Sequence, residues 1–542
     1  MSWHPPYRRS KFRHVYGKPA SKENCYDGLS ITRSVHDNLF CSVNPRFIAV
    51  VTECAGGGAF LVISIHHRGR VDPHHPRVCG HSGRVLDIKW DPFNDQRIAS
   101  CSEDCTVKVW DIPGNGVKEN ITIPRKELRG HTRRVNLVQW HPTAKDVLFS
   151  SAYDYKVLVW RLDTGGLVMK TPVCVISVHS DLVLSMCLHS DGTRLATSCK
   201  DKRIRIIDPR TGKLLQESCC KSHRPSKVVF LENHNMLLST GTSQWNQRQF
   251  ALWDTDDLSV SLLEEDLDGG SGVLFPFYDP DLHMLYLAGK GDGNIRYYEV
   301  ASEKPYIHFL AEYRSPLPQR GLAVMPKRGL DMSACEVYRF YRLVTTKDLV
   351  EPLSFIVPRR SEGFQEDIYP MTAGNEASMT AQEWLMGQKK GPVLLSLKPE
   401  TKILNPYPAP VEVKRLYQHP HHSVERAFLE EQLAYQDAKY THDIRDLSGW
   451  QEDETQTQEW TNTYRGNTLS IQSHKPLAHS ELHWCESAVY IPPPGETELL
   501  QVFYRQQEEI RRLRQQLDHK DERIRQLELE IRNLRNYMRA SF

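Results

Sequence analysis

Residues 80–111, GHSGRVLDIKWDPFNDQRIASCSEDCTVKVWD, decide the fold, and residues 130–161, GHTRRVNLVQWHPTAKDVLFSSAYDYKVLVWR, repeat their pattern. Each copy opens with Gly-His, ends with Trp and a polar residue, and carries an Asp six positions before that Trp. The segments between are short apolar or alternating runs that turn residues separate, which is typical of β-strands. A period of roughly 40–45 residues is the signature of a four-stranded propeller blade. The pattern therefore predicts an all-β repeat protein.

Three further segments follow the same template. They run from His179 to Asp208, from His223 to Asp254, and to a close at Tyr298-Glu299 that lacks the His. The closing residues lie about 47 positions apart. Six positions before each closing residue stands a polar side chain: Asp104, Asp154, Asp201, Gln247 or Asp292. We expect the turn Asp to hold the His of the preceding loop, and the His to orient the Trp through a hydroxyl group.

Strand-like segments on both sides of these five repeats predict two additional blades. Residues 47–51 and 59–63 precede the series, and residues 338–344 and 353–357 follow it. The chain is therefore expected to form a seven-bladed β-propeller over residues 1–360, with clear repeats over about 78–300. A closed ring hides its sheet edges. We expect residues 10–16 to supply the closing strand beside residues 338–357.

The composition excludes several classes of protein. Of 542 residues, 39% are hydrophobic and 25% charged, while the formal net charge is only +2, which disfavours a globally basic nucleic-acid binder. No run of about 18 apolar residues predicts a membrane span, and the N-terminal residues contain no apolar signal region. The 13 cysteines are odd in number and include no C-x-x-C spacing, which indicates a reduced, cytoplasmic protein.

The residues after the propeller change in character. Residues 396–498 collect prolines and polar residues, together with an acidic stretch at 452–454, and are expected to be a mostly disordered linker. Residues 499–538 carry a heptad repeat, which predicts a coiled coil. The expected pairs between edge positions, such as Glu509 with Arg514 and Glu530 with Arg535, join opposite charges in a parallel arrangement. Its expected seam includes Leu513, Leu517, Ile524, Leu527, Ile531 and Leu534.

The chain resembles the coronins. The resemblance rests on residues 10–15 (SKFRHV), 54–60 (CAGGGAF), 78–81 (VCGH) and 102–110 (SEDCTVKVW), and it covers about residues 7–395 and the terminal heptads. Residues 21–26 (SKENCY) and the long linker are more similar to the type II than to the type I branch. The resemblance implies a seven-bladed propeller, an extension over residues 361–395 that packs on it, and a role in binding and organising filamentous actin.

The resemblance also indicates how many chains the coiled coil joins. Residues 523–528 (RIRQLE) match an Arg-h-x-x-h-Glu pattern of short trimeric coiled coils, coronins included, with Arg523 and Glu528 at edge positions. Isoleucine at a with leucine at d instead favours two strands. We expect a homo-oligomer, with the trimer favoured over the dimer.

Candidate actin-binding residues are the cations near the N-terminus. Where type I coronins carry a basic residue important for filament binding, this chain has Ser30, which predicts weaker binding there. Positive charge toward acidic actin is expected instead from Arg8, Arg9, Lys11, Arg13 and Arg33. The alternative reading is that these residues are solvated or serve strand pairing.

No enzymatic or metal chemistry is predicted. His74, His75, Cys79 and His81 are interrupted by prolines and do not form a convincing metal site, and the glycine-rich residues 289–293 lead into a strand and not into a phosphate-binding helix. We expect no catalytic residues and no cofactor. Two functions remain: an actin scaffold in the cytoplasmic cytoskeleton, with a nuclear pool compatible with the sequence, and a WD-repeat adaptor of another, potentially nuclear, assembly.

Overall fold

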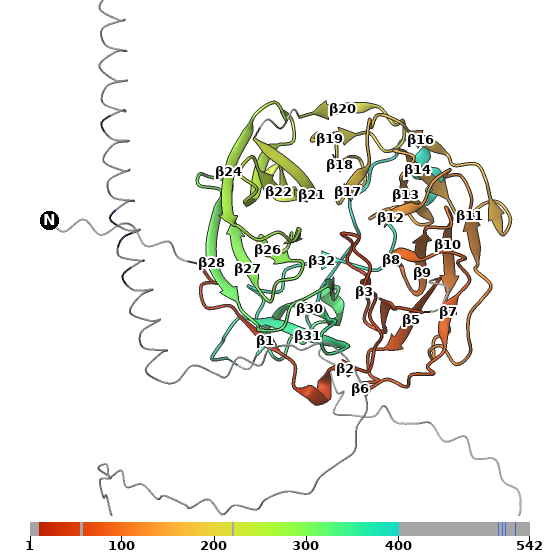
Figure 1. The fold of residues 1–542 in the computed structure, drawn as a ribbon, viewed down its shortest axis with the longest axis horizontal. Helices are drawn as coiled ribbons and strands as arrows, with labels where there is room; N and C mark the ends of the chain where they lie inside the picture. The colour runs from red at the N-terminus through yellow and green to blue at the C-terminus, as the bar shows by residue number, and fades with distance from the viewer. Residues whose placement is uncertain are drawn as a thin grey trace, which may run out of the picture. The chain divides into compact units, whose positions relative to one another are not determined.

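The computed structural model describes residues 10–399 apart from 55–57, 219, 221 and 362, together with four helical positions farther on, Glu508, Arg512, Gln515 and Gln526. Within residues 10–399 the chain forms seven mainly antiparallel sheets that stand like blades around a central channel (Figure 1). This arrangement confirms the seven-bladed propeller.

The first four blades follow one another along the chain. Blade 1 comprises β3 (Cys41–Val43), β4 (Phe47–Val51), β5 (Ala59–Ser64) and β7 (Arg77–Cys79); blade 2 comprises β8 (Val85–Asp91), β9 (Asn94–Ser102), β10 (Val107–Asp111) and β11 (Lys126–Leu128), with β15 (Val168–Met169) added at its edge. Blade 3 comprises β12 (Val135–Trp140), β13 (Val147–Ala152), β14 (Val157–Arg161) and β16 (Cys174–Ile176); blade 4 comprises β17 (Val183–Leu188), β18 (Leu195–Cys199), β19 (Ile204–Ile207) and β20 (Leu214–Glu217).

Three blades complete the ring. Blade 5 comprises β21 (His223–Leu231), β22 (Met236–Ser243), β23 (Arg248–Asp254) and β24 (Ser261–Asp268); blade 6 comprises β25 (Leu274–Asp279), β26 (Met284–Gly289), β27 (Ile295–Val300) and β28 (Ile307–Tyr313). Blade 7 comprises β29 (Gly321–Val324), β30 (Glu336–Val344) and β31 (Leu349–Ile356), with β1 (Tyr16–Pro19), β2 (Tyr26–Asp27) and β6 (Gly69–Arg70) at its edge. The other elements are η1 (Lys22–Asn24), η2 (Glu232–His234), η3 (Lys327–Gly329), β32 (Thr372–Ala373), α1 (Ala381–Leu385) and β33 (Leu394–Leu395).

The middle strands of the blades are buried on both faces, because each sheet packs between its two neighbours. Every residue of β4, β13 and β18 is buried. The middle strands therefore need continuous runs of apolar residues, whereas a strand with one face in water would alternate apolar and polar residues. Hydrophobic clusters fill the spaces between adjacent blades; one joins Leu86 and Ala99 of blade 2 to Leu148 and Trp160 of blade 3.

An N-terminal strand closes the ring, but not with the predicted residues. β1 pairs antiparallel with β31, so that Tyr16 lies opposite Ile356 and Pro19 opposite Leu353 (Figure 1). The expectation that residues 10–16 form this strand was wrong in its bounds. Phe12 and Val15 instead belong to a turn, in which the Val15 amide donates to the Phe12 carbonyl at 3.0 Å, and both side chains are buried. Their burial anchors the residues that lead into the closing strand.

The residues after blade 7 contact the propeller at blades 3 and 4. Helix α1 begins with a capping box, in which Thr380 and Glu383 each accept a hydrogen bond from the other's backbone amide. Trp384 is fully buried, with its ring centroid 4.9 Å from that of His141. Arg210 of blade 4 donates to the Gln388 carbonyl at 2.8 Å.

The up-and-down order of strands gives the ring two different faces. We call relay face the one formed by the loops that precede the first strand of each blade, such as 80–84 and 130–134, and by the turns between second and third strands, such as 103–106 and 153–156. The turns between first and second strands, such as 141–146, lie on the opposite face, where Ser378 contacts the Thr143 carbonyl.

Candidate partner-binding surface

The predicted hydrogen-bond relay is present in blades 2 and 3. In blade 2, His81 Nδ1 lies 2.8 Å from Asp104 Oδ2, His81 Nε2 lies 2.8 Å from Ser100 Oγ, and Trp110 Nε1 donates to the same hydroxyl at 2.8 Å. In blade 3, His131, Asp154, Ser150 and Trp160 repeat the arrangement. The relay ties the relay face to the blade interior, as expected for a stabilising element.

Electrostatics hold the relay carboxylates in their charged form. Burial alone would raise the pKa of Asp104, but hydrogen bonds and charge from His81 and hydrogen bonds from Thr106 outweigh it, so that the pKa lies well below its usual range. The pKa of Asp154 is lowered by the same balance with His131. The carboxylates of both aspartates thus form hydrogen bonds within their own blades.

In blade 5 the relay uses a residue that the sequence did not indicate. Gln249 Oε1, and not Gln247, accepts the hydrogen bond from His223 Nδ1 at 2.7 Å, while Ser239 joins His223 to Trp253. Trp245 occupies the turn position that belongs to Asp104 in blade 2, because the amide of each donates to the serine two residues earlier. A longer side chain from β23 therefore replaces the missing carboxylate.

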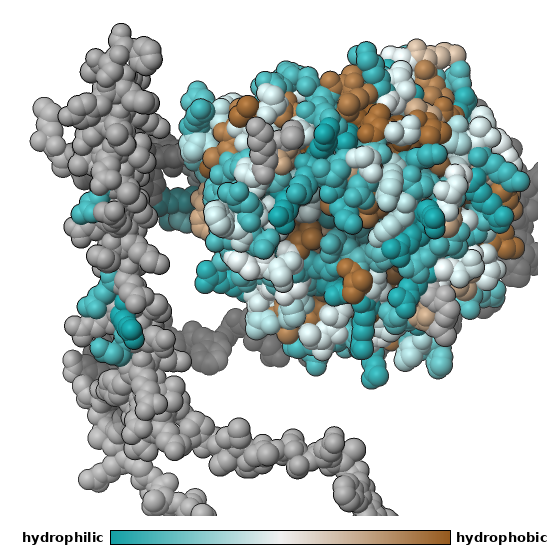
Figure 2. Space-filling view, turned by 45° about the horizontal axis from the view of Figure 1, so that its top comes forward, coloured by the Kyte–Doolittle hydropathy of each residue, from teal (hydrophilic) through white to brown (hydrophobic). Residues whose placement is uncertain are grey.

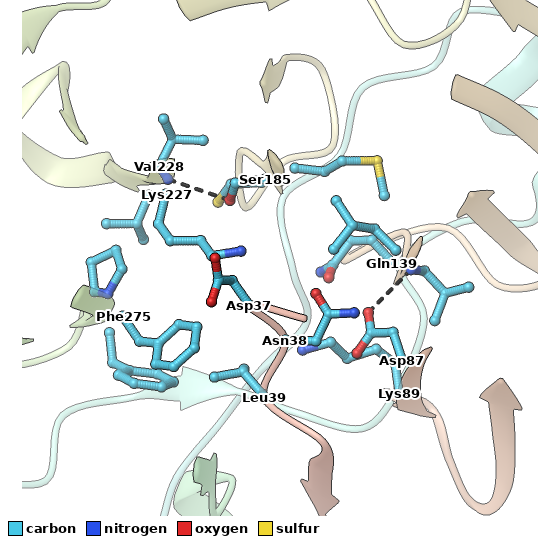
Figure 3. Close-up of a pocket in the computed structure, with 17 residues that line it drawn as sticks. Asp37, Asn38, Leu39, Asp87, Lys89, Gln139, Ser185, Lys227, Val228 and Phe275 are labelled. Carbon is cyan, nitrogen blue, oxygen red and sulfur yellow. Dashed lines mark hydrogen bonds between the residues drawn. The ribbon is translucent and has the colours of Figure 1, made fainter. Parts of the chain in front are cut away.

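The central channel holds a cavity of about 240 Å³. Figure 3 shows side chains from the first strands of several blades, and from the loop before β3, converging on it. Lys227 donates from Nζ to the Leu184 carbonyl at 2.8 Å, and burial lowers its pKa to about 8. Asp87 accepts hydrogen bonds from the amides of Ile88 and Val138, while burial raises its pKa. These hydrogen bonds join adjacent blades along the channel wall, blade 5 to blade 4 and blade 3 to blade 2.

The channel offers a poor setting for nucleophilic chemistry. Burial raises the pKa of the Cys187 thiol to about 12, so the reactive thiolate is absent at neutral pH. Among residues 10–399 as described, no group of three or more His, Cys, Asp or Glu side chains is arranged to hold a metal ion. In the same part of the chain, no helix has the length and apolar character to cross a bilayer.

The candidate cations lie on opposite faces of the ring. Arg33 is exposed on the relay face; its amide donates to Glu53 Oε2 at 3.1 Å and its carbonyl accepts from Arg320 at 2.8 Å. Ser30 is exposed beside it, 3.4 Å from the Glu53 carbonyl. Lys11 and Arg13 are also exposed, but Lys11 donates to the Asp367 carbonyl beyond the other end of β31.

The register of the closing strand determines this separation. The amide of Leu29 donates to Asp348, just before β31 begins, whereas Tyr16 pairs with Ile356, where β31 ends. The length of β31 therefore separates Arg33 from Lys11 and Arg13, and these three cations do not form one patch. Arg8 and Arg9 lie outside the described residues. So do Leu513, Leu517, Arg523, Ile524, Leu527, Glu528, Ile531 and Leu534, and the coiled coil stays a prediction.

The mouth of the channel on the relay face carries residues that no sequence motif indicated. His36, Arg134 and Tyr153 line a cavity of about 400 Å³ there, and the Arg134 guanidinium lies 3.9 Å from the Tyr153 ring centroid. Tyr153 immediately precedes the relay residue Asp154. Aligning the repeats on that aspartate therefore predicts that Tyr153 lies in a turn on the relay face.

A second exposed surface lies along the rim of the ring. Figure 2 shows apolar side chains grouped at the edge that carries β16 and β20. The exposed apolar residues of these strands and their flanks are Val173, Val175, Leu214 and Leu215.

Comparisons with known proteins agree with the fold. A model of a domain of unknown function (DUF1899) matches residues 6–70; the WD domain, G-beta repeat, matches residues 75–111, 123–161 and 170–208; and a further type of WD40 repeat matches residues 350–392. The chain is 57% identical over 538 residues to Coronin-2A of Homo sapiens and 54% identical over 536 residues to Coronin-2B of Homo sapiens. The alignments cover 99% of this chain in both cases, 99% of Coronin-2A and 98% of Coronin-2B.

A solved structure is similar as well. The crystal structure of the WD40 domain from Toxoplasma gondii coronin aligns with a TM-score of 0.66 and 27% sequence identity, covering 71% of this chain and 98% of that one.

Proposed function

The chain belongs to the coronin family, in the type II branch with coronin-2A and coronin-2B, and on that premise we propose that it is an actin-filament-binding scaffold that organises the actin cytoskeleton. Membership in this family of WD-repeat scaffolds also means that the chain is not an enzyme. The observation that carries the proposal is the extent of the match, which runs over 99% of the chain and so includes both the propeller and the heptads.

The propeller is suited to act as the contact platform. Its relays and buried strands hold loops from seven blades in fixed relative positions, so a partner meets a preorganised surface. The heptads would join several platforms in one homo-oligomer, with a trimer favoured through Arg523 and Glu528. Weak contacts then add by avidity, because linked sites experience a high effective concentration. We place the protein in the cytoplasm, on actin structures.

Of the candidate cations, we propose that Arg33 contributes to the filament contact from the relay face. Lys11 and Arg13 would contribute from the opposite face, and Arg8 and Arg9 stay candidates from the sequence alone. Separate variants at Arg33 and at the Lys11–Arg13 pair therefore distinguish which face meets the filament.

Sedimentation with filamentous actin tests the proposal. The full-length chain is spun with and without filaments at several salt concentrations, and we expect it to pellet only with filaments. The pelleted fraction should fall as salt rises, because screening weakens contacts between exposed charges. Failure to pellet with filaments at the lowest salt concentration would contradict the proposed function.

A further inference from the structure

Five exposed cations lie on the relay face of blades 3 to 5. They stand in the loop before the first strand of blade 3, in the turns of blades 3 and 4, and at the start of β21 in blade 5, and we call them the basic crescent: Arg133, Lys156, Lys200, Lys202 and Arg224. Within the described residues, the ion pairs of this region use other cations, such as Arg134 and Arg203. The five charges are therefore available to a partner.

Contacts between blades keep the crescent continuous. Asn136 Nδ2 donates to the Val183 carbonyl at 3.0 Å, which joins blades 3 and 4, and Ser198 Oγ donates to the Ser226 carbonyl at 3.0 Å, which joins blades 4 and 5. Within blade 4, the Lys200 amide donates to the Leu182 carbonyl at 2.9 Å and fixes the turn against the preceding loop. The crescent thus lies on rigid supports.

The carboxylates of the same turns do not neutralise these charges. Asp154 accepts hydrogen bonds from His131 and from the Thr132 amide. Asp201 is bound by Arg205 at 2.6 Å and by the Ser180 hydroxyl at 2.7 Å. Because Arg205 compensates the charge of Asp201 and five cations outnumber the two carboxylates, the crescent keeps an excess of positive charge although the whole chain carries only +2.

Two exposed aromatic side chains accompany the crescent. Trp245, at the turn of blade 5, is 76% exposed, and Tyr155, at the turn of blade 3, is 42% exposed. Tyr155 and Lys202 occupy the same turn position in their blades, each with φ +65°. Tryptophan, tyrosine and arginine are the residues that most often dominate the energy of protein interfaces. An indole held in water on a rigid turn is consistent with such an anchor.

We propose that the basic crescent, with Trp245 as its apolar anchor, is the part of the relay face that carries most of the contact with the actin filament. The inference rests on the proposed function and gives it a location. The partner surface must be acidic and must offer an apolar recess for the indole. The carboxylate of Asp154 interrupts the cations of blade 3, which would repel the continuous phosphates of a nucleic acid but suits the separate carboxylates of a protein surface.

A charge-matched pair of variants tests the inference in the full-length chain. The crescent variant is Lys200→Ala/Lys202→Ala/Arg224→Ala. The control is Lys118→Ala/Lys145→Ala/Lys213→Ala, which removes as many exposed cations from loops and turns on the opposite face. Exposed substitutions of this kind leave stability nearly unchanged, which melting temperatures verify.

In sedimentation with filamentous actin, we expect the apparent Kd of the crescent variant to rise on the order of tenfold, with a shallower salt dependence, and that of the control to change less than about twofold. Trp245→Ala should weaken pelleting about equally at low and high salt, because it removes an apolar contact. Restored pelleting by Lys200→Arg/Lys202→Arg/Arg224→Lys would further support the surface, since that variant keeps the charges.

Four outcomes would overturn the inference. If the unaltered chain pellets and the crescent variant pellets equally well, the filament contact lies elsewhere and the proposed function stands. If both triple variants lose binding equally, only net charge matters. If the unaltered chain does not pellet at all, the inference fails together with the proposed function. Binding of single-stranded RNA that disappears in the crescent variant, with filament binding intact, would assign the surface to nucleic acid instead.

Discussion

The imidazole of His131 is held from both sides, by Ser150 at 2.8 Å and by Asp154 at 2.9 Å. Replacing Asp154 by Ala leaves the buried Nδ1 without its partner and also frees the Thr132 amide. We expect a loss of about 1–3 kcal/mol in the free energy of unfolding, measured by thermal melting. Asp154→Asn is the matched control; it keeps one acceptor oxygen and should cost less. A melting temperature unchanged by Asp154→Ala would refute the role of the relay.

His141 makes the stability of the propeller depend on pH. Its Nδ1 accepts hydrogen bonds from the amides of Thr143 and Ala144, and burial, aided by the charge of Arg210, lowers its pKa from 6.5 to about 4. Between these two values the unfolded chain binds the proton and the folded chain does not, so stability falls as pH falls from 6.5 toward 4.

At pH 5 we expect this histidine to cost about 2 kcal/mol relative to pH 7.5. Urea unfolding at the two pH values measures the difference, and His141→Asn should reduce it by about that amount, whatever its effect on stability at neutral pH. Burial lowers the pKa of His179 to about 4 as well, so part of the pH dependence should remain. His66→Asn, at an exposed position, is the control. An equal pH dependence in His141→Asn and in the unaltered chain would contradict the assignment.

At the scale of elements, the single turn of α1 is too short to be stable alone and depends on its anchor. Trp384 packs against His141 and Phe149, with centroid distances of 4.9 and 6.2 Å. We expect Trp384→Ala to destabilise the protein by about 3–5 kcal/mol and to expose residues near α1 to proteolysis. Met386→Ala, where the side chain is 71% exposed, should change little. Equal melting temperatures for the two variants would show that α1 does not support blade 3.

At the scale of the whole molecule, we expect the predicted coiled coil to set how strongly a modest contact surface binds. Deleting residues 499–542 should leave a folded, monomeric propeller whose apparent affinity for filaments falls on the order of tenfold or more, because avidity is lost. Sedimentation with filaments measures the affinity and light scattering the stoichiometry. A truncated chain that binds as tightly as the full-length chain would remove avidity from the mechanism.

Arg523→Ala probes the oligomer more finely. It removes the expected pair with Glu528 while keeping the apolar seam of Ile524 and Leu527, so we expect a weakened or redirected trimer. Light scattering of the full-length variant and of the unaltered chain, compared at equal concentration, measures this. An unaltered trimer in the variant would show that the pair does not determine the number of strands.

The sequence by itself determined the number of blades and the relays of blades 2 and 3. Strand alternation and the spacing of His81, Asp104 and Trp110 are local properties, which recur wherever the same blade forms. Tertiary structure determined the roles of residues whose position depends on strand length and strand register. In blade 5, Trp253 follows its turn by two more residues than Trp110 does in blade 2. An alignment that counts back from the closing residue therefore selects Gln247, although Gln249 is the residue that binds His223.

Only the folded ring could show that Tyr16–Pro19, and not residues 10–16, closes blade 7, since burial of Phe12 and Val15 against distant blades sets the start of the strand. The same register places Lys11 and Arg33 at opposite ends of β31, although they are close in the sequence. Conversely, the up-and-down order of strands gathers Arg133, Lys202 and Arg224 on one face from three consecutive blades. Pairing between remote segments determines these placements, and no local pattern in the chain encodes the energy of such pairing.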